Sequence, residues 1–172
     1  MDHTNRSAPP AVVGGLLLLG IAGRLLPHPW NVTPLIGVAL LGGALLPARW
    51  AVALPVVIAA ASDLVLGWHT TLPFTWGAFA LAAVIGAQLR HPSLVRVAVG
   101  AVAASTAFFV VSNVGVWLVG GLYPATADGL GACFIAAVPF YRQMLVGDVI
   151  CALALFSLAA VARQLPSPVR VR

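Results

Sequence analysis

The sequence carries very little charge, and least of all negative charge. Among its 172 residues only four are acidic, and charged residues of either sign make up 8% of the chain. Hydrophobic residues make up 61%, and the mean hydropathy is +1.03. Ordinary soluble domains contain about 25% charged residues. The composition therefore excludes a typical soluble protein and indicates an integral membrane protein.

Several common functional patterns are also missing. The chain has no Lys and no Walker-type glycine loop, so it is not expected to hydrolyse ATP itself. The two cysteines, Cys133 and Cys151, form neither a disulfide framework nor a CxxC metal pattern. All nine basic residues are Arg, and they are scattered singly. They resemble topology signals more than a nucleic-acid-binding patch, so we expect no nucleic-acid partner and no required cofactor.

Apolar runs separated by Pro, Gly and Arg predict an all-α membrane protein with six transmembrane helices. A spanning helix needs about 20 residues, so six helices nearly fill the chain, and residues 1–172 are expected to form a single integral membrane domain. A shorter apolar stretch, Leu130 to Val138, is expected to lie at the interface or to re-enter, separated from the last helix by Pro139. The predicted helices cover residues 11–26, 34–46, 50–67, 75–89, 93–119 and 142–164.

The distribution of Arg predicts how the helices are oriented. Cytoplasmic loops carry an excess of basic residues. With residue 1 inside, the outer loops hold only Arg24 and Arg142. We therefore expect both termini in the cytoplasm, with a multi-pass arrangement in the membrane. The inner segments hold the other seven, which are Arg6, Arg49, Arg90, Arg96, Arg163, Arg170 and Arg172.

Polar groups that are unusual in apolar helices converge on the outer half of this arrangement. Asp63 and Asp148 lie inside apolar runs, where a carboxylate costs roughly 2.5–3.5 kcal/mol on insertion scales. Aromatic, amide and imidazole groups occur in the outer loops and helix ends, whereas the inner loops offer little beyond Arg. This asymmetry predicts a ligand site open to the outside. Its candidate residues are His28, Asn31, Asp63, Trp68, His69, Trp76, Asn113, Trp117, Tyr123 and Asp148.

Each of these groups also has a purely structural interpretation. The two aspartates are equally consistent with helix bridges, and the Trp residues with an interfacial belt. A ligand-free structural subunit is therefore one alternative. Another is an intramembrane aspartyl hydrolase that uses Asp63 and Asp148 as an acid/base pair. Such enzymes carry a Gly-x-Gly-Asp motif, whereas residues 145–148 read Leu-Val-Gly-Asp. We therefore expect no catalytic residues.

Four segments carry a resemblance to a known family. They are residues 24–34 (RLLPHPWNVTP), 62–69 (SDLVLGWH), 112–117 (SNVGVW), and the stretch from Tyr123-Pro124 to Gly147-Asp148. Together they resemble the substrate-binding S components of energy-coupling-factor (ECF) vitamin transporters. Within that group the nearest resemblance is to the solitary cobalamin-specific S components, the BtuM type.

The resemblance implies a six-helix S-component-like bundle in the inner membrane of a bacterium. It also implies that the protein captures a vitamin, cobalamin first, at the periplasmic face and moves it inward, alone or with an ECF ATPase module. An S component for another small molecule is the alternative. Cobalamin-specific relatives can use a Cys near the loop before the fourth helix as a cobalt ligand, but residues 72–83 contain none. If protein ligates cobalt, His28 and His69 are the candidate axial ligands. Small residues in the first and fifth predicted helices are consistent either with close approach of a partner helix or with internal packing. They are Gly15, Gly20, Gly23, Gly100 and Ala104.

Overall fold

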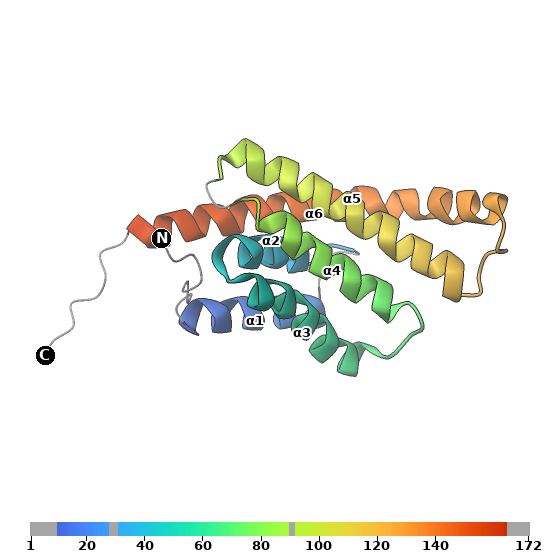
Figure 1. The fold of residues 1–172 in the computed structure, drawn as a ribbon, viewed down its shortest axis with the longest axis horizontal. Helices are drawn as coiled ribbons and strands as arrows, with labels where there is room; N and C mark the ends of the chain where they lie inside the picture. Colours follow the sequence, from blue (N-terminus) through green and yellow to red (C-terminus); the bar gives the residue numbers. More distant parts are fainter. Residues whose placement is uncertain (1–9, 28–30, 90–91, 165–172) are drawn as a thin grey trace, which may run out of the picture.

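The computed structural model describes residues 10–27, 31–89 and 92–164, and all regular structure within these ranges is helical (Figure 1). The prediction of an all-helical chain with six helices is confirmed for this part of the sequence. The helices are α1 (Pro10–Leu25), α2 (Leu35–Leu45), α3 (Ala48–Leu66), α4 (Leu72–Gly86), α5 (Leu94–Val119) and α6 (Ala127–Gln164).

The ends of the helices follow from local chemistry in the sequence. The Ser93 hydroxyl accepts a hydrogen bond from the backbone N–H of Arg96 at 3.3 Å and caps the start of α5. Helix α3 stops at Gly67, whose φ of 108° lies in the region that favours glycine. Helix α4 starts at Leu72, with Pro73 in its first turn, where a missing N–H costs nothing.

Helix α6 differs from the prediction. It starts at Ala127 and runs through Pro139 to Gln164, so residues 130–138 belong to the same helix and form no separate interfacial or re-entrant segment. Proline removes one backbone hydrogen bond, and apolar helices tolerate this when neighbouring groups compensate. The residues on both sides of Pro139 are apolar and helical, so the proline does not end the helix.

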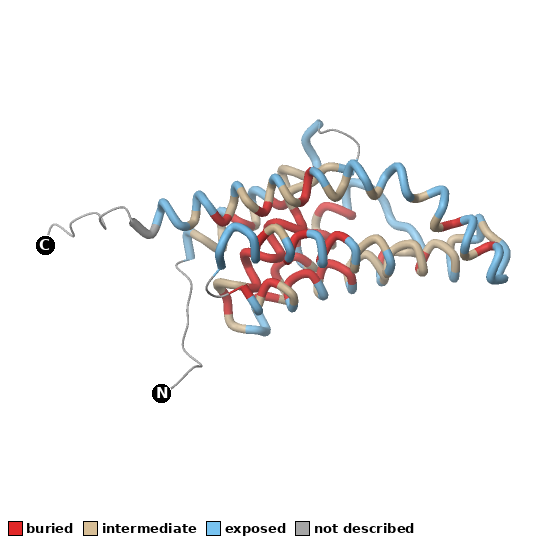
Figure 2. Tube along the Cα trace, turned by 90° about the horizontal axis from the view of Figure 1, so that it is seen from above, coloured by how far each residue is buried: buried red, intermediate tan, exposed pale blue. Residues whose placement is uncertain are grey.

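Helix α2 forms the centre of the bundle. Its residues Leu35 to Gly43 are all buried, and it contacts each of the other five helices. A helix that is apolar on every side is stable only when it is surrounded. Figure 2 shows the buried residues concentrated in this central region. The short apolar run predicted at residues 34–46 is therefore a core helix, which explains why it contains no charged residue.

Helices α2 and α4 cross with their backbones in contact. A Cβ atom at Gly43 would overlap the carbonyl oxygen of Ala83, and one at Gly86 would overlap the carbonyl of Leu40. Both positions therefore need glycine for steric reasons. Close contacts of this kind are common where small residues meet between apolar helices.

Other small residues also serve internal packing. Gly20, Gly23 and Gly100 each lie against a side chain of this chain, and Ala104 is fully buried. Gly15 is exposed and has open space at its Cβ position. Internal packing, and not contact with a partner helix, therefore accounts for these small residues except Gly15.

The helices differ greatly in length. Helices α3, α5 and α6 are long and apolar enough to cross a membrane, whereas α1, α2 and α4 are shorter. The three long apolar helices indicate a membrane protein. Figure 1 shows α5 and α6 as an antiparallel pair that extends past the other four helices. The start of α1 and the end of α6 lie at the same end of the bundle, opposite the turn between α5 and α6.

Candidate ligand-binding site

A cavity of about 320 Å³ opens at the end of the bundle where α1 meets α2 and α3 meets α4. All six helices contribute to its wall, together with the two connecting segments. Its lining residues are Arg24, Asn31, Thr33, Ile36, Leu66, His69, Thr75, Phe79, Phe108, Met144 and Asp148. The sequence-based prediction placed its polar candidates at this same end, and three of them, Asn31, His69 and Asp148, line the cavity.

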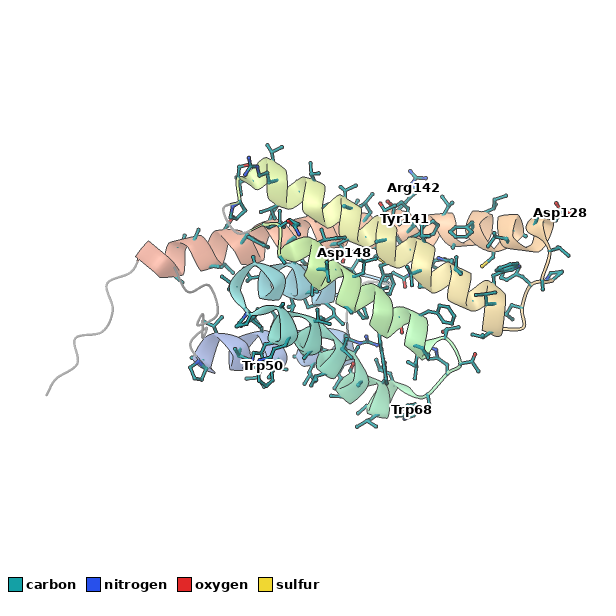
Figure 3. The ribbon with its side chains drawn as sticks, viewed as in Figure 1. Trp50, Trp68, Asp128, Tyr141, Arg142 and Asp148 are labelled. Atoms are coloured by element: carbon teal, nitrogen blue, oxygen red, sulfur yellow. The ribbon has the colours of Figure 1, made fainter. Side chains whose placement is uncertain are left out.

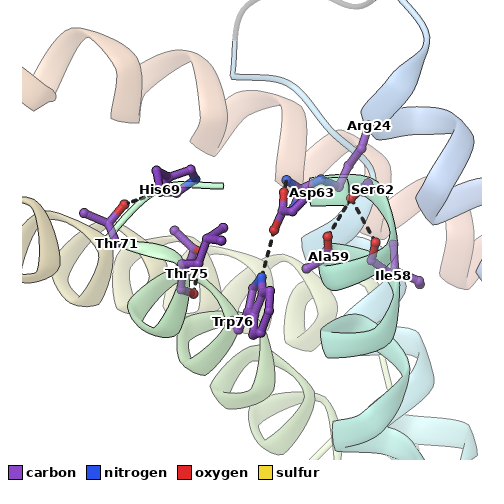
Figure 4. Close-up of polar contacts among 10 residues, drawn as sticks. Arg24, Ile58, Ala59, Ser62, Asp63, His69, Thr71, Thr75 and Trp76 are labelled. Atoms are coloured by element: carbon purple, nitrogen blue, oxygen red, sulfur yellow. Dashed lines mark hydrogen bonds and ion pairs between the residues drawn. The ribbon is translucent and has the colours of Figure 1, made fainter. Parts of the chain in front are cut away.

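On one side of the cavity, Asp63 forms an ion pair with Arg24. The Arg24 Nη2 atom donates to Asp63 Oδ1 at 2.6 Å, and Trp76 Nε1 donates to Asp63 Oδ2 at 2.8 Å (Figure 4). The Asp63 side chain is 2% exposed and that of Arg24 is 16% exposed. Both carboxylate oxygens of Asp63 therefore accept a hydrogen bond, and Arg24 on α1 neutralises the negative charge.

The Arg distribution predicts that Arg24 is an outer-loop residue that helps to set the topology. It lies instead in the last turn of α1, where it lines the cavity and pairs with Asp63. Its guanidinium carbon also lies 5.8 Å from the centre of the Phe79 ring, within the range of a cation–π contact. Arg24 therefore joins α1 to α3 and α4, in addition to any effect on orientation.

On another side of the cavity, Asp148 has a different environment. The Ser105 hydroxyl donates to Asp148 Oδ2 at 2.7 Å, and both residues are buried. Within the described residues no Arg or Lys forms an ion pair with Asp148, and no hydrogen bond joins it to Asp63. Figure 3 places Asp148 in the middle of α6, facing the other helices. Asp148 thus brings an uncompensated carboxylate to the cavity wall.

The two loops at this end supply further polar groups. His69 is exposed, and its Nδ1 lies 2.7 Å from the hydroxyl of Thr71, so this hydrogen bond orients the imidazole (Figure 4). Asn31 is also exposed and has a φ of 57°, a left-handed conformation that Asn adopts more readily than most residues. His28 lies outside the described residues, as does Trp30. Across the described chain, no three His, Cys, Asp or Glu residues come together as a metal-binding group.

The aromatic wall of the cavity consists of phenylalanines. Phe79 and Phe108 have ring centroids 4.7 Å apart and both line the cavity. Trp76 donates its hydrogen bond to Asp63 and is not itself a lining residue. Trp68 packs edge-to-face on Trp76, with ring centroids 6.1 Å apart. Trp68 is 69% exposed, so it lies at the outer surface of this region.

Three other candidates lie on the extended α5–α6 pair and do not line the cavity. The Asn113 side-chain amide donates to the carbonyl of Phe109 at 2.8 Å, one turn earlier in α5. Trp117 Nε1 donates to the carbonyl of Pro124 at 2.9 Å and so closes the turn between the helices, where Tyr123 is half-buried. These contacts give Asn113 and Trp117 structural partners within the hairpin.

Sequence reasoning missed several residues of the cavity wall. Arg24 carried a usable signal, because a charged residue in an apolar helix usually has a partner of opposite charge. Phe79 and Phe108 carried none, since Phe is common in apolar helices. Ser105, which bonds Asp148 and is not itself a lining residue, carried none either. Their positions at the cavity depend on how α4, α5 and α6 pack together.

A second and larger cavity lies at the opposite end of the bundle. It has a volume of about 710 Å³ and is formed by the ends of α2 and α6 and the start of α5. The polar side chains that the structure describes in its wall are two serines. With no charged group among those lining residues, this cavity lacks the convergent polar groups that fix a small ligand. The lining residues are Leu41, Ala44, Leu45, Leu89, Pro92, Ser93, Leu94, Val97, Phe156, Ser157, Ala159 and Ala160.

Comparison with known proteins gives one family assignment. The model of a family described as "Family of unknown function (DUF6580)" matches residues 4–169. No curated protein and no solved structure matches the chain.

Proposed function

The chain belongs to the DUF6580 family of unknown function, and we propose that it binds a small vitamin-class molecule at the outer face of a bacterial inner membrane and moves it inward. The observation that carries this proposal is the cavity into which Arg24, His69 and Asp148 converge. Ionisable groups inside a membrane are costly and usually mark a substrate or ion pathway. A ligand that contacts them would offset part of that cost.

The size of the cavity bears on the ligand. Small-molecule pockets occupy about 300–1,000 Å³. The volume of about 320 Å³ is at the lower end of that range. It suits a compact molecule of one or two rings with hydrogen-bonding groups. A corrinoid is larger than a typical drug-sized ligand, so it would require the two outer loops to move apart.

Cobalamin, the ligand implied by the sequence resemblance, becomes the second candidate; it is supported by His69, which places an imidazole at the cavity wall. Neutral imidazole is a suitable donor for cobalt. A preparation that carries cobalamin would be red. Restored cobalamin-dependent growth in a strain without its own transporter, with this chain alone or with an ECF module, would establish this candidate. If growth is restored neither by this chain alone nor by this chain together with an ECF module, cobalamin is excluded and the compact molecule is the proposed ligand.

The proposed topology has six membrane crossings with both termini in the cytoplasm. It is supported by the Arg distribution and by the position of the start of α1 and the end of α6 at one end of the bundle. The short helices α1, α2 and α4 would cross by locally thinning the bilayer or by packing within the longer helices. The polar cavity would then open to the periplasm and the apolar cavity to the cytoplasm.

Thiol labelling tests this orientation. In a background without Cys133 and Cys151, a Cys replacing Thr71 or Thr126 should react with a membrane-impermeant reagent added to intact cells. A Cys replacing Ala48, which is exposed at the start of α3, should react only after the membrane is opened. The opposite pattern would place the cavity on the cytoplasmic side and contradict uptake from outside.

Ligand capture can be tested with two variants of equal bulk. Met144 lines the cavity, whereas its neighbour Gln143 is exposed on α6. Mass spectrometry of the purified chain should reveal a co-purified small molecule that is lost in Met144→Trp and kept in Gln143→Trp. If both variants and the parent chain carry none, and no added vitamin raises the melting temperature, the chain is a ligand-free structural subunit.

The arrangement favours binding over hydrolysis. An aspartyl hydrolase requires two carboxylates that share a proton. Here Asp63 is bound by Arg24 and Trp76, and Asp148 is bound by Ser105. We therefore propose no catalytic role for either aspartate.

A further inference from the structure

We propose that the ligand of the outer cavity is a small organic monocation with an aromatic or heteroaromatic body, whose positive charge pairs with Asp148. This inference rests on the proposed binding function and specifies the chemical class of the ligand. It depends on three observations, which are the charge balance of the cavity, the position of Asp148 and the paired phenylalanine rings.

The charge balance is negative. Within the described residues, the charged side chains at or directly behind the cavity wall are Arg24, Asp63 and Asp148. The positive charge of Arg24 is matched by Asp63 at 2.6 Å. One carboxylate, that of Asp148, remains without a cation. A buried charge of this kind is costly unless it is paired, and a cationic ligand supplies the missing partner.

The free side of Asp148 faces the cavity. One carboxylate oxygen accepts the Ser105 hydroxyl at 2.7 Å, and no hydrogen bond from a described residue reaches the other. The residue is only 1% exposed, but it contributes to the cavity wall. Ser105 therefore holds one oxygen of Asp148 in place. The second oxygen of Asp148 is not fully buried and is available to a hydrogen-bond donor on the ligand.

The aromatic wall favours an organic cation over a metal ion. The face of an aromatic ring attracts a positive charge. Phe79 and Phe108 line the same cavity, but Phe79 is buried and Arg24 already lies over its ring, so the half-buried Phe108 is the ring of this pair that a ligand can contact. An inorganic cation requires a shell of several oxygen ligands, whereas Asp148 is the one carboxylate in the described wall. A flat body stacked on Phe108, with its cationic group toward Asp148, satisfies both features.

The test uses two matched sets of probes that differ in charge and little in shape. One set is benzamidinium, benzamide and benzoate, and the other is 2-phenylethylammonium, 2-phenylethanol and phenylacetate. Each probe is titrated into the purified full chain in detergent and followed by tryptophan fluorescence, since Trp76 lies behind the cavity. We expect the cation of each set to bind at least about tenfold more tightly than its neutral and anionic analogues, as a charge-assisted hydrogen bond implies.

Two isosteric variants identify the carboxylate that is responsible. Asp148→Asn should remove the preference for the cation, so that the cation binds about as weakly as its neutral analogue. Asp128→Asn removes the same charge at an exposed position at the far end of α6, and it should leave the preference unchanged (Figure 3). The preference of the unmodified chain is informative by itself, so the test stands even if Asp148→Asn folds poorly.

The outcomes separate this inference from the proposed function. If neutral or anionic probes bind more tightly than the cations, and Met144→Trp abolishes this binding, the ligand is not a cation. The proposed function of the cavity in ligand binding would still stand. The specific pairing would also be overturned if sodium chloride weakened the binding of the cations to the same extent in Asp148→Asn and in the parent chain. If no probe binds and no ligand co-purifies, the proposed function fails, and this inference fails with it.

Discussion

The two buried carboxylates of this protein lie near one cavity, but their surroundings differ. Asp63 has both oxygens occupied, by Arg24 from α1 and by Trp76 from α4. Asp148 has one hydroxyl partner, Ser105, and lines the cavity directly. Asp63 therefore joins three helices, whereas Asp148 is held in place with one side available to a ligand.

This difference separates a structural role from a functional one. Both aspartates are equally unusual in the sequence, because each interrupts an apolar run. A neutralised and fully bonded carboxylate stabilises the bundle, and its loss should reduce stability. A buried carboxylate without a cation does not stabilise the bundle, and its loss should mainly affect binding. The following predictions test this distinction, beginning with the largest effect.

Loss of Arg24 should have the largest effect on stability. Arg24→Ala leaves the charge of Asp63 buried without its cation, so the free energy of unfolding should fall by about 3–5 kcal/mol. Arg142→Ala is the matched control, because Arg142 is exposed and points away from the bundle (Figure 3). Its effect should stay within about 0.5 kcal/mol. Denaturant unfolding in detergent measures both.

A double variant tests whether the loss of stability in Arg24→Ala comes from leaving the charge of Asp63 unpaired. Arg24→Ala combined with Asp63→Ala should be more stable than Arg24→Ala alone, because no unpaired charge is left. If Arg24→Ala were as stable as Arg142→Ala, the ion pair would not hold α1 to α3, and the contrast between the two aspartates would be lost.

Loss of the indole hydrogen bond should have an intermediate effect. Trp76→Phe keeps most of the packing but removes the donor to Asp63 Oδ2, so we expect the free energy of unfolding to fall by about 1.5–3 kcal/mol. Trp68→Phe changes a mostly exposed ring for which no hydrogen bond is observed in the described structure. It should have a clearly smaller effect, and equal effects would contradict the structural role of Trp76.

Loss of the Ser105 hydroxyl should have the smallest effect on stability. Ser105→Ala frees an Asp148 oxygen that can turn to water or ligand in the cavity, so we expect a loss of about 1 kcal/mol. The same variant should weaken ligand binding, because the carboxylate is no longer fixed. Ser112→Ala, which removes a long 3.4 Å bond to the carbonyl of Phe109, is the control for both measurements. A larger loss of stability than in Trp76→Phe would contradict the proposed contrast.

Much of the fold was accessible from the sequence because apolar runs and helix-ending residues are local signals. Five helices lie close to their predicted ranges, and three of the predicted site residues, Asn31, His69 and Asp148, line one cavity. The long helix α6 was missed at its start, because Pro139 suggested a break that the apolar surroundings tolerate. The sequence predicts Asn113 and Trp117 to be site residues because it indicates the depth of a residue along a helix but not the direction of its side chain around the helix.

The sequence by itself determined the class of the protein, the number of helices and the end at which polar groups gather, since these depend on composition and on short-range patterns. Only the tertiary structure decided that Asp63 is paired with Arg24, that Asp148 has no cation beside it, and that Phe79 and Phe108 line the cavity. The reason is geometric. Partners 39 and 43 residues apart meet only when the helices pack, and the contact between α2 and α4 at Gly43 and Gly86 sets how closely they do so.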